Sequence, residues 1–348
     1  MTDTILTIPA MIVLLGTLIF FHELGHFTLA KLLKIKVEEF AFGFGPKWIR
    51  LFKRGETEYT IHPVPLGGFV KLAGMEPGEE NVPGGYGSKP WWGRFLVCAA
   101  GPFMSFVLAY AIFCTLGVFI GVPTNALNQV ERVEPGSRAE QAGLRAGDRI
   151  VEISGERIET GSEMVEIVHR SAEKPLVIVV VRDGRIIRMH ATPAPGKLGK
   201  DVGLLGFTPV QEIQRVGLME SVRFGNEFTF SILKAVIVSL FSRNVAENVG
   251  GPIAIILATK ASVQGGFGFF LQWIGLMSLS VGIVNLVPIP VADGGHMALL
   301  LVEGIKRRRL SPRTWEAAQR LGLTLIAIIF VLIMYLDLSR VVSGKLFQ

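Results

Sequence analysis

The sequence predicts a polytopic α-helical membrane protein with four spans and one small α/β domain between the second and third spans. The mean hydropathy of the 348 residues is +0.47, and only 18% of them are charged. Soluble domains usually contain about 25% charged residues. The apolar residues gather in a few long runs, and a polar stretch, residues 123–209, separates the second run from the third. This pattern is typical of a membrane protein that carries one soluble domain.

Four apolar runs are long enough to cross a bilayer, for which a helix needs about 20 residues. The runs are Ile5–Leu33, Phe95–Val122, Phe267–Val291 and Leu321–Leu336. The third contains Pro288 and Pro290 near its end, so we expect it to begin as a helix and to unwind where it lines a cavity. A fifth run, Phe228–Phe241, is interrupted by Lys234 and suits an interfacial helix better than a span.

Basic residues orient these spans. They cluster after the first span, at residues 31–54, and between the last two spans, at residues 306–313. By the positive-inside rule both clusters face the cytoplasm, which leaves the two termini and the polar domain on the outer side. The first and third spans then run in the same direction, and their C-terminal ends reach the same depth.

The chain therefore divides into eight segments. These are 1–36 (first span), 37–94 (a cytoplasmic segment with a β-hairpin at about 58–72), 95–122 (second span), 123–210 (the outer α/β domain), 211–264 (interfacial helices and linker), 265–296 (third span), 297–320 (a basic cytoplasmic loop) and 321–340 (fourth span). Because the N-terminus lacks a basic region and a cleavage site, we expect a retained anchor rather than a signal peptide.

Composition excludes some classes of function. The net charge of +6 is modest, and no basic stripe with interleaved aromatic residues suggests nucleic-acid binding. Cys98 and Cys114 both lie in an apolar run and are poorly placed for a disulfide, so they say little about the redox compartment.

The chemistry centres on an H-E-x-x-H motif at the end of the first span, in the run Phe20–Phe27. Positions i and i+4 share one face of a helix, so His22 and His26 can bind one metal ion. Glu23 can reach a water at that metal without being a ligand itself. Polar groups at membrane depth are costly and usually functional. The motif therefore indicates a metal site inside the membrane boundary.

The segment Glu58–Leu72 reads as two short strands about a Pro/Gly turn, and its prolines confine such strands to an edge. An ordinary cytoplasmic hairpin is one interpretation. Alternatively, a shielded tip dips into the membrane and holds an extended peptide by β-addition, with Gly67, Gly68 and Phe69 as the residues that bind the substrate strand.

The polar domain shows its own pattern of strands and helices. Its strands are expected at Gln129–Val133, Asp148–Ile153, Leu176–Val181 and Ile186–His190, and its main helix at Ser162–His169. The Asp183-Gly184 pair predicts a tight hairpin between the last two strands. Nothing in this domain suggests catalysis, and His169 and His190 read as ordinary solvated or packed histidines.

A second motif completes the site, in the run Asn285–His296, which reads N-L-V-P-I-P-V-A-D-G-G-H. Together with F-F-H-E-L-G-H-F, it resembles the site-2 protease family of intramembrane zinc metalloproteases. The resemblance implies that Asp293 is the third zinc ligand. Two positions depart from the family pattern: Ala292 stands where Leu is usual, and Ser105 stands where an A-G-P-x-x-N stretch has Asn.

The resemblance extends to the other segments. The run Gly143–Asp148 makes the outer domain similar to a single PDZ domain, and Gly68–Leu72 makes the hairpin similar to the family's membrane re-entrant β-loop. It implies a multi-pass protein of the bacterial inner membrane whose active site faces the cytoplasm. His62 and His296 are interpreted as cytoplasmic surface residues.

The implied activity is regulated intramembrane proteolysis. Zn²⁺ on His22, His26 and Asp293 keeps one position open for water, Glu23 is the general base, and Asn285 stabilises the oxyanion or has a structural role. The expected partners are membrane lipid and single-span substrates, such as an anti-sigma factor or a remnant signal peptide. The PDZ-like domain would filter them by size or bind peptide C-termini.

Three other functions remain open from the residues alone. The chain could be a membrane-anchored zinc protease that attacks loops from a soluble site, or a non-catalytic PDZ scaffold. A transporter is disfavoured because the polar groups cluster at one depth and the sequence shows no internal repeat.

Overall fold

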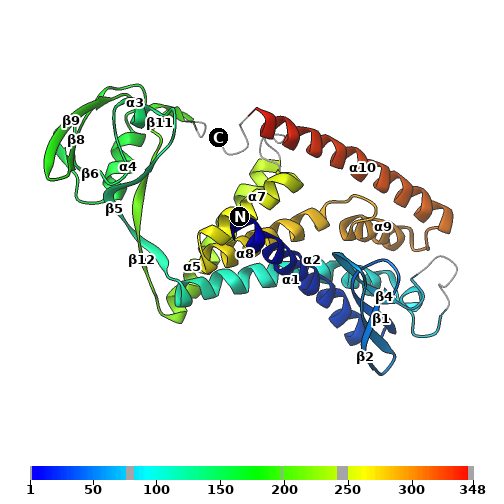
Figure 1. Ribbon diagram of the computed structural model, residues 1–348. Helices are drawn as coiled ribbons and strands as arrows, with labels where there is room; N and C mark the ends of the chain where they lie inside the picture. Colours follow the sequence, from blue (N-terminus) through cyan, green and yellow to red (C-terminus); the bar gives the residue numbers. More distant parts are fainter. Residues whose placement is uncertain (1, 76–81, 197–198, 241–249, 344–348) are drawn as a thin grey trace. The chain divides into compact units, whose positions relative to one another are not determined.

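The computed structural model describes residues 2–75, 82–196, 199–240 and 250–343, which form two compact units (Figure 1). Unit 1 combines Met1–Leu116 with Ser221–Gln348, and unit 2 is Gly117–Glu220. Unit 1 contains the long apolar helices and a small sheet, whereas unit 2 is the α/β domain. The sequence places the domain at 123–210, and the structural unit extends beyond both of these limits.

Unit 1 is built from long helices. They are α1 (Thr2–Leu32), α2 (Trp91–Phe119), α5 (Leu218–Leu240), α7 (Pro252–Gln264), α8 (Phe267–Leu286), α9 (Asp293–Lys306) and α10 (Pro312–Val342), with a short 3₁₀ turn, η1 (Tyr86–Ser88), before α2. In the described chain, four are long and apolar enough to cross a membrane: α1 from Leu6 onward, α2, α8 and α10. This confirms the predicted number of candidate spans. Helix α5 contains most of the fifth run and is not among them.

The third span unwinds as predicted. Helix α8 ends at Leu286, residues 287–292 are not helical, and α9 begins at Asp293. The prediction of a basic loop over 297–320 is wrong for most of its length, because α9 continues to Lys306 and α10 begins at Pro312. The apolar face of α9 explains the difference, since Leu300 is fully buried against α1 and α2 residues.

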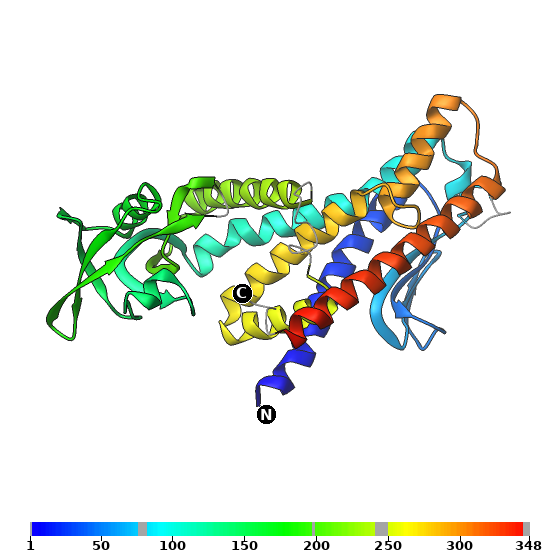
Figure 2. The same cartoon turned by 90° about the horizontal axis from the view of Figure 1, so that it is seen from above.

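A four-stranded sheet packs beside the C-terminal half of α1 (Figures 1 and 2). Its strands are β1 (Val37–Phe44), β2 (Ile49–Arg54), β3 (Thr57–Ile61) and β4 (Val64–Leu72), in the order β2-β3-β1-β4. The predicted hairpin is wrong, because β3 and β4 do not pair with each other. Strand β1, which the sequence analysis did not assign, lies between them, parallel to β3 and antiparallel to β4. Strand β4 nevertheless lies at the edge, as predicted.

Unit 2 is a small α/β fold. Its elements are β5 (Val122–Val133), α3 (Arg138–Gln141), β6 (Arg149–Ile153), β7 (Glu156–Arg157), α4 (Gly161–His169), β8 (Leu176–Arg182), β9 (Arg185–Ala191), β10 (Ala194–Gly196), β11 (Gly199–Leu204) and β12 (Phe207–Gln214). The four predicted strands, the main helix and the tight turn are confirmed. Asp183 and Gly184 both have positive φ, as a hairpin turn of this kind requires. Strand β12 pairs with β5, so the chain enters and leaves this unit on neighbouring strands.

Candidate active site

Three side chains from the two sequence motifs meet at one point. His22 and His26 lie one turn apart on α1, and Asp293 is the first residue of α9. The Oδ2 atom of Asp293 lies 3.0 Å from Nε2 of His22 and 3.4 Å from Nε2 of His26, and the two Nε2 atoms are 3.3 Å apart. All three side chains are mostly buried. The structure thus brings together residues that are 271 positions apart in the chain.

These distances fit a zinc ion. Ligand atoms about 2.0–2.1 Å from a tetrahedral zinc lie roughly 3.3–3.4 Å from one another, close to the three separations found here. Two imidazoles and one carboxylate are also a ligand set that catalytic zinc uses, with the fourth position open. In the described residues this is the only cluster of this kind. The three residues therefore fit Zn²⁺.

Groups on α2 form hydrogen bonds with the Nδ1 atoms of both imidazoles. Nδ1 of His26 donates to the carbonyl of Val97 at 2.7 Å, and Nδ1 of His22 lies 3.2 Å from Oγ of Ser105. A hydrogen bond at Nδ1 fixes the ring and leaves Nε2 to face the metal. Ser105, which departs from the family pattern, is fully buried and takes this supporting position. The sequence analysis did not assign a role to either partner.

Two glycines allow α1 and α2 to approach closely at this level. A Cβ on Gly25 would overlap the carbonyl of Ala100, and a Cβ on Gly101 would overlap Nε2 of both histidines. The backbone of α2 therefore forms one wall of the metal site. Only glycine fits at these two positions.

The loop between α8 and α9 positions Asp293. Gly294 and Gly295 lie so close to the carbonyls of Leu286 and Ile289 that neither has room for a Cβ. The carbonyl of Ala292 accepts the N–H groups of Gly295 and His296, so this residue contributes through its backbone. Val291 has a φ of 100°, which is rare for a β-branched residue. Strain of this kind is usual where a loop presents a functional group.

A cavity of about 360 Å³ opens beside the three ligands. Glu23, Phe69 and Asn285 line it together with His22, His26 and Asp293. Val70, also on β4, lines the cavity with Glu23. The predicted base, the oxyanion candidate and three residues of the edge strand, Phe69, Val70 and Leu72, thus share one cavity with the candidate metal ligands.

Gly67 and Gly68, which precede Phe69 on β4, do not face the cavity. Gly68 packs against α1, where a Cβ would overlap Ile19 and touch the Cγ of Glu23. Gly67 packs against the ring of Phe44. Neither lines the cavity, and their role in binding a substrate strand through the backbone of β4 stays a prediction.

The other histidines of unit 1 differ from the prediction. His62 is buried within the small sheet, where Nδ1 donates to the carbonyl of Gly45, so its assignment to the surface is wrong. His296 is also not a surface residue: it lines the cavity, stacks edge-on against Trp315, and its Nε2 is buried with no partner among the described residues. His296 follows Asp293 by three residues, so a helix beginning at Asp293 places both on one face. This spacing could have predicted that His296 lies near the site.

In unit 2 a buried ion pair between Asp148 and Arg182 has a structural role. The carboxylate of Asp148 is buried and accepts hydrogen bonds from the guanidinium of Arg182 at 2.6 and 2.7 Å. This hydrogen bonding raises the pKa of Arg182 above its ordinary value. A shallow pocket elsewhere on this unit is lined by Arg138, Leu204 and Gly206 among others. No catalytic cluster is found in the described part of the unit.

Comparisons with known proteins find relatives along most of this chain. The profile of peptidase family M50 matches residues 10–329. The regulator of sigma-W protease RasP of Bacillus subtilis is 29% identical over 96% of this chain and 98% of its own. Candidate zinc metalloproteases of Campylobacter jejuni and Clostridium acetobutylicum are 33% and 32% identical, over 96% and 92% of this chain and 94% of each relative.

Solved structures resemble part of the chain. The PDZ domain of an SdrC-like protein from Listeria monocytogenes is 22% identical and covers 26% of this chain and 94% of its own, with a TM-score of 0.22. A solution structure from Geobacillus thermodenitrificans is 29% identical over 24% of this chain and 95% of its own, with a TM-score of 0.21.

Proposed function

This chain belongs to peptidase family M50, and we propose that His22, His26 and Asp293 hold its zinc ion while Glu23 is its general base. The protein is a zinc metalloprotease of the site-2 type, which acts within the membrane. The observation that carries the residue assignment is the convergence of three ligand atoms at 3.0–3.4 Å beside a cavity that also contains Glu23.

In the proposed reaction zinc, Glu23 and Asn285 each have a separate role. Bound zinc supplies a Lewis acid that makes water nucleophilic near neutral pH and polarises the scissile carbonyl. Glu23 takes a proton from the attacking water and passes it to the leaving amine. The side-chain amide of Asn285 donates to the oxyanion that forms on the carbonyl carbon.

Strand β4 binds the substrate in this proposal. A transmembrane helix shields its own peptide bonds, so the substrate must become extended before water can attack it. In the described sheet β4 pairs only with β1, which leaves its other edge without a strand partner. Phe69 on β4 lines the cavity beside Glu23. An unwound substrate segment added to this edge would pass the catalytic residues.

Helix geometry supports a site within the bilayer rather than in a soluble domain. Trp91 and Trp92 begin the candidate span α2, and tryptophans prefer the membrane interface. Gly101, which touches both histidines, lies ten residues further along the helix, or about 15 Å at 1.5 Å per residue. That is about half the thickness of the hydrocarbon core. A protease that attacks loops from a soluble site would not need this depth.

We further propose that the substrates are single-span membrane proteins, such as an anti-sigma factor or a remnant signal peptide. One relative is named as a regulator of sigma-W. Basic clusters at residues 31–54 and 306–313 support an active site that opens to the cytoplasm, with both termini and unit 2 outside. Unit 2, as a PDZ-like domain, would then bind a trimmed peptide C-terminus, with Arg138 as the cation in its pocket.

The test uses Glu23→Gln in the full-length protein, assayed with a single-span model substrate. We expect cleavage to fall by at least about a hundredfold while zinc stays bound, because the ligands are untouched. Glu227→Gln, an exposed position on α5, is the matched control and should keep full activity. Full activity of Glu23→Gln would contradict the assignment. Equal, stoichiometric zinc in wild type and Asp293→Ala would contradict the ligand set, and wild type without stoichiometric zinc would favour a non-catalytic scaffold.

A further inference from the structure

A second cavity, away from the catalytic one, lies where the start of α2 meets the end of α9. Its volume is about 300 Å³, within the range of small-ligand sites. Its charged lining consists of Lys89, Arg94, Glu303, Arg307, Arg308 and Arg309. Five cations thus surround one carboxylate in a single hollow.

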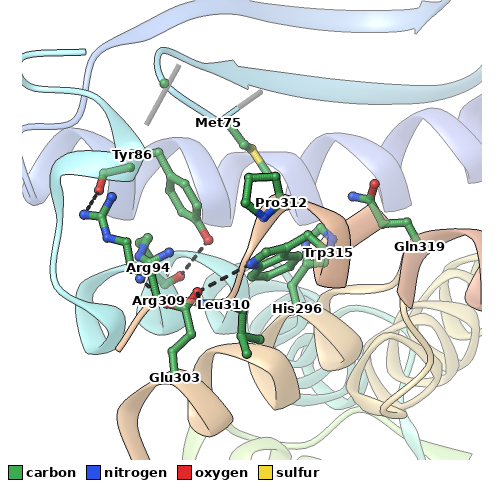
Figure 3. A pocket seen from close by; sticks show the side chains of 12 residues that line it. Met75, Tyr86, Arg94, His296, Glu303, Arg309, Leu310, Pro312, Trp315 and Gln319 are labelled. Atoms are coloured by element: carbon green, nitrogen blue, oxygen red, sulfur yellow. Dashed lines mark hydrogen bonds and ion pairs between the residues drawn. The ribbon is translucent and has the colours of Figure 1, made fainter. Parts of the chain in front are cut away.

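The one carboxylate is already fully engaged (Figure 3). Glu303 is buried, forms an ion pair with Arg94, and accepts hydrogen bonds from the backbone N–H of Leu310 and the indole N–H of Trp315. It therefore cannot neutralise the other cations. The cavity keeps a strong excess of positive charge.

Several cationic side chains at this cavity have no acceptor among the described residues. Lys89, Arg307 and Arg308 form no ion pair with any described residue. Arg94 is only 8% exposed, yet its Nε finds no hydrogen-bond partner in the part of the chain that the structure describes. A buried donor without a partner costs free energy, so this position favours a ligand that supplies anionic oxygens.

The backbone holds the arginines in place. Arg307 ends α9 in the left-handed conformation, with φ 51° and ψ 25°, and this turn brings three consecutive arginines to one cavity. Nη2 of Arg309 donates to the carbonyl of Gly87 at 2.5 Å, which ties the turn to the segment before α2. Gly304 leaves room for the indole of Trp91, which also lines the cavity.

The depth of the cavity distinguishes a lipid from a soluble anion. The candidate spans α2 and α10 both begin beside it, at Trp91 and Pro312. Trp91 and Trp92 are large, partly exposed aromatic residues at the start of α2, where an aromatic belt meets the headgroups. Basic pockets between helices at this level bind anionic headgroups.

We propose that this cavity binds the phosphodiester headgroup of an anionic membrane lipid. The guanidinium groups of Arg307 and Arg308 and the ammonium of Lys89 contact the phosphate oxygens, and the acyl chains lie along the apolar surface of α2. The bound lipid braces the C-terminal end of α9, the helix whose first residue is Asp293. The proposal does not depend on the assignment of the catalytic base.

The test measures binding of phosphatidylglycerol to the full-length protein in detergent by native mass spectrometry, with phosphatidylcholine as the zwitterionic comparison. The site variant is Lys89→Gln/Arg308→Gln. The matched control is Lys306→Gln/Arg313→Gln, which removes the same charge from residues that do not line the cavity. Each cation near a membrane surface changes affinity by about fivefold. We expect the site variant to bind phosphatidylglycerol at least about tenfold more weakly, and the control to stay within about threefold of wild type.

Three results would overturn the proposal. They are equal weakening in the two double variants, equal wild-type affinity for phosphatidylglycerol and phosphatidylcholine, and displacement of phosphatidylglycerol by low-millimolar inorganic phosphate, which would identify a soluble anion. If the double variant fails to fold, Arg308→Gln alone is compared with Arg313→Gln. A threefold or greater difference between these single variants supports the site, and no difference refutes it.

Discussion

At the scale of single residues, the proposed metal site depends on groups other than its candidate ligands. Ser105 and the carbonyl of Val97 hold the two imidazoles from α2, and Gly101 leaves space for both rings. None of the three belongs to the H-E-x-x-H or Asp-Gly motifs. They are the residues at which the proposed geometry can be tested without removing a ligand.

Ser105→Ala should weaken zinc binding by about tenfold or more, because His22 loses the hydrogen bond that orients its ring. The measurement is competition for zinc against a calibrated chelator. Ser280→Ala is the matched control, since that hydroxyl bonds only its own helix, at the carbonyl of Leu276. Equal affinities of the two variants would show that Ser105 does not position the ligand.

Gly101→Ala should lower zinc occupancy strongly, although alanine favours a helix by about 1 kcal/mol over glycine. Its Cβ would occupy the space of both Nε2 atoms. Gly93→Ala, on the same helix, meets only ordinary contacts and should bind zinc like the wild type. Metal analysis of the two purified proteins makes the comparison. Full occupancy in Gly101→Ala would mean that α2 does not form the wall described here.

At the scale of elements, a side chain of α10 caps the N-terminus of helix α7. Asp337, fully buried on α10, accepts the backbone N–H groups of Gly251, Ile253 and Ala254. The first N–H groups of a helix have no partner within it, so this carboxylate satisfies the N-terminus of α7 and fastens α10 to it. A Cβ on Gly251 would overlap the carboxylate, which explains the glycine.

Asp337→Ala should therefore destabilise unit 1 by about 1–3 kcal/mol, since one buried and two part-buried backbone donors lose their acceptor. For a unit of this size we expect a fall in Tm of roughly 2–6 °C, measured by thermal unfolding of the full-length protein in detergent. Leu338→Ala, an exposed position one residue further on, is the control and should change Tm by less than about 2 °C. An unchanged Tm in Asp337→Ala would show that the cap contributes nothing.

At the scale of the whole molecule, zinc should link segments that are distant in sequence. Its proposed ligands come from α1 and α9 of unit 1, and none comes from unit 2. Metal binding that joins two elements stabilises both of them. Unit 2 has its own apolar core, centred on Ile150, Ile153 and Met164.

Removal of zinc with a chelator should speed amide hydrogen exchange around residues 22–26 and 287–296. Peptides from Gly117–Glu220 act as the internal control and should exchange at the same rate with and without metal. Mass spectrometry of the full-length protein reads both regions in one experiment. Uniform changes in both units would contradict a site confined to α1 and α9.

Much of the fold could be predicted because its signals are local. The candidate spans follow from the length of the apolar runs, and the strands of unit 2 from their apolar patterns and the Asp183-Gly184 turn. The small sheet could not be predicted in the same way. Strand β1 carries Glu38 and Glu39 and pairs with β3 in parallel, and parallel pairing leaves no turn signal between neighbouring strands.

The sequence by itself predicted the ligand types, the base and the approximate depth of the proposed site. Spacing on one helix face makes His22 and His26 neighbours, and two motifs near the ends of apolar runs indicate one zinc site. Only the tertiary structure decided that Asp293 reaches both histidines, that Ser105 supports His22, and that His296 lines the cavity with its Nε2 buried. These contacts join α1, α2 and α9, and they depend on how closely the helices approach. Helix periodicity is encoded within a few residues, whereas that close approach depends on glycines whose neighbours lie far away in the chain.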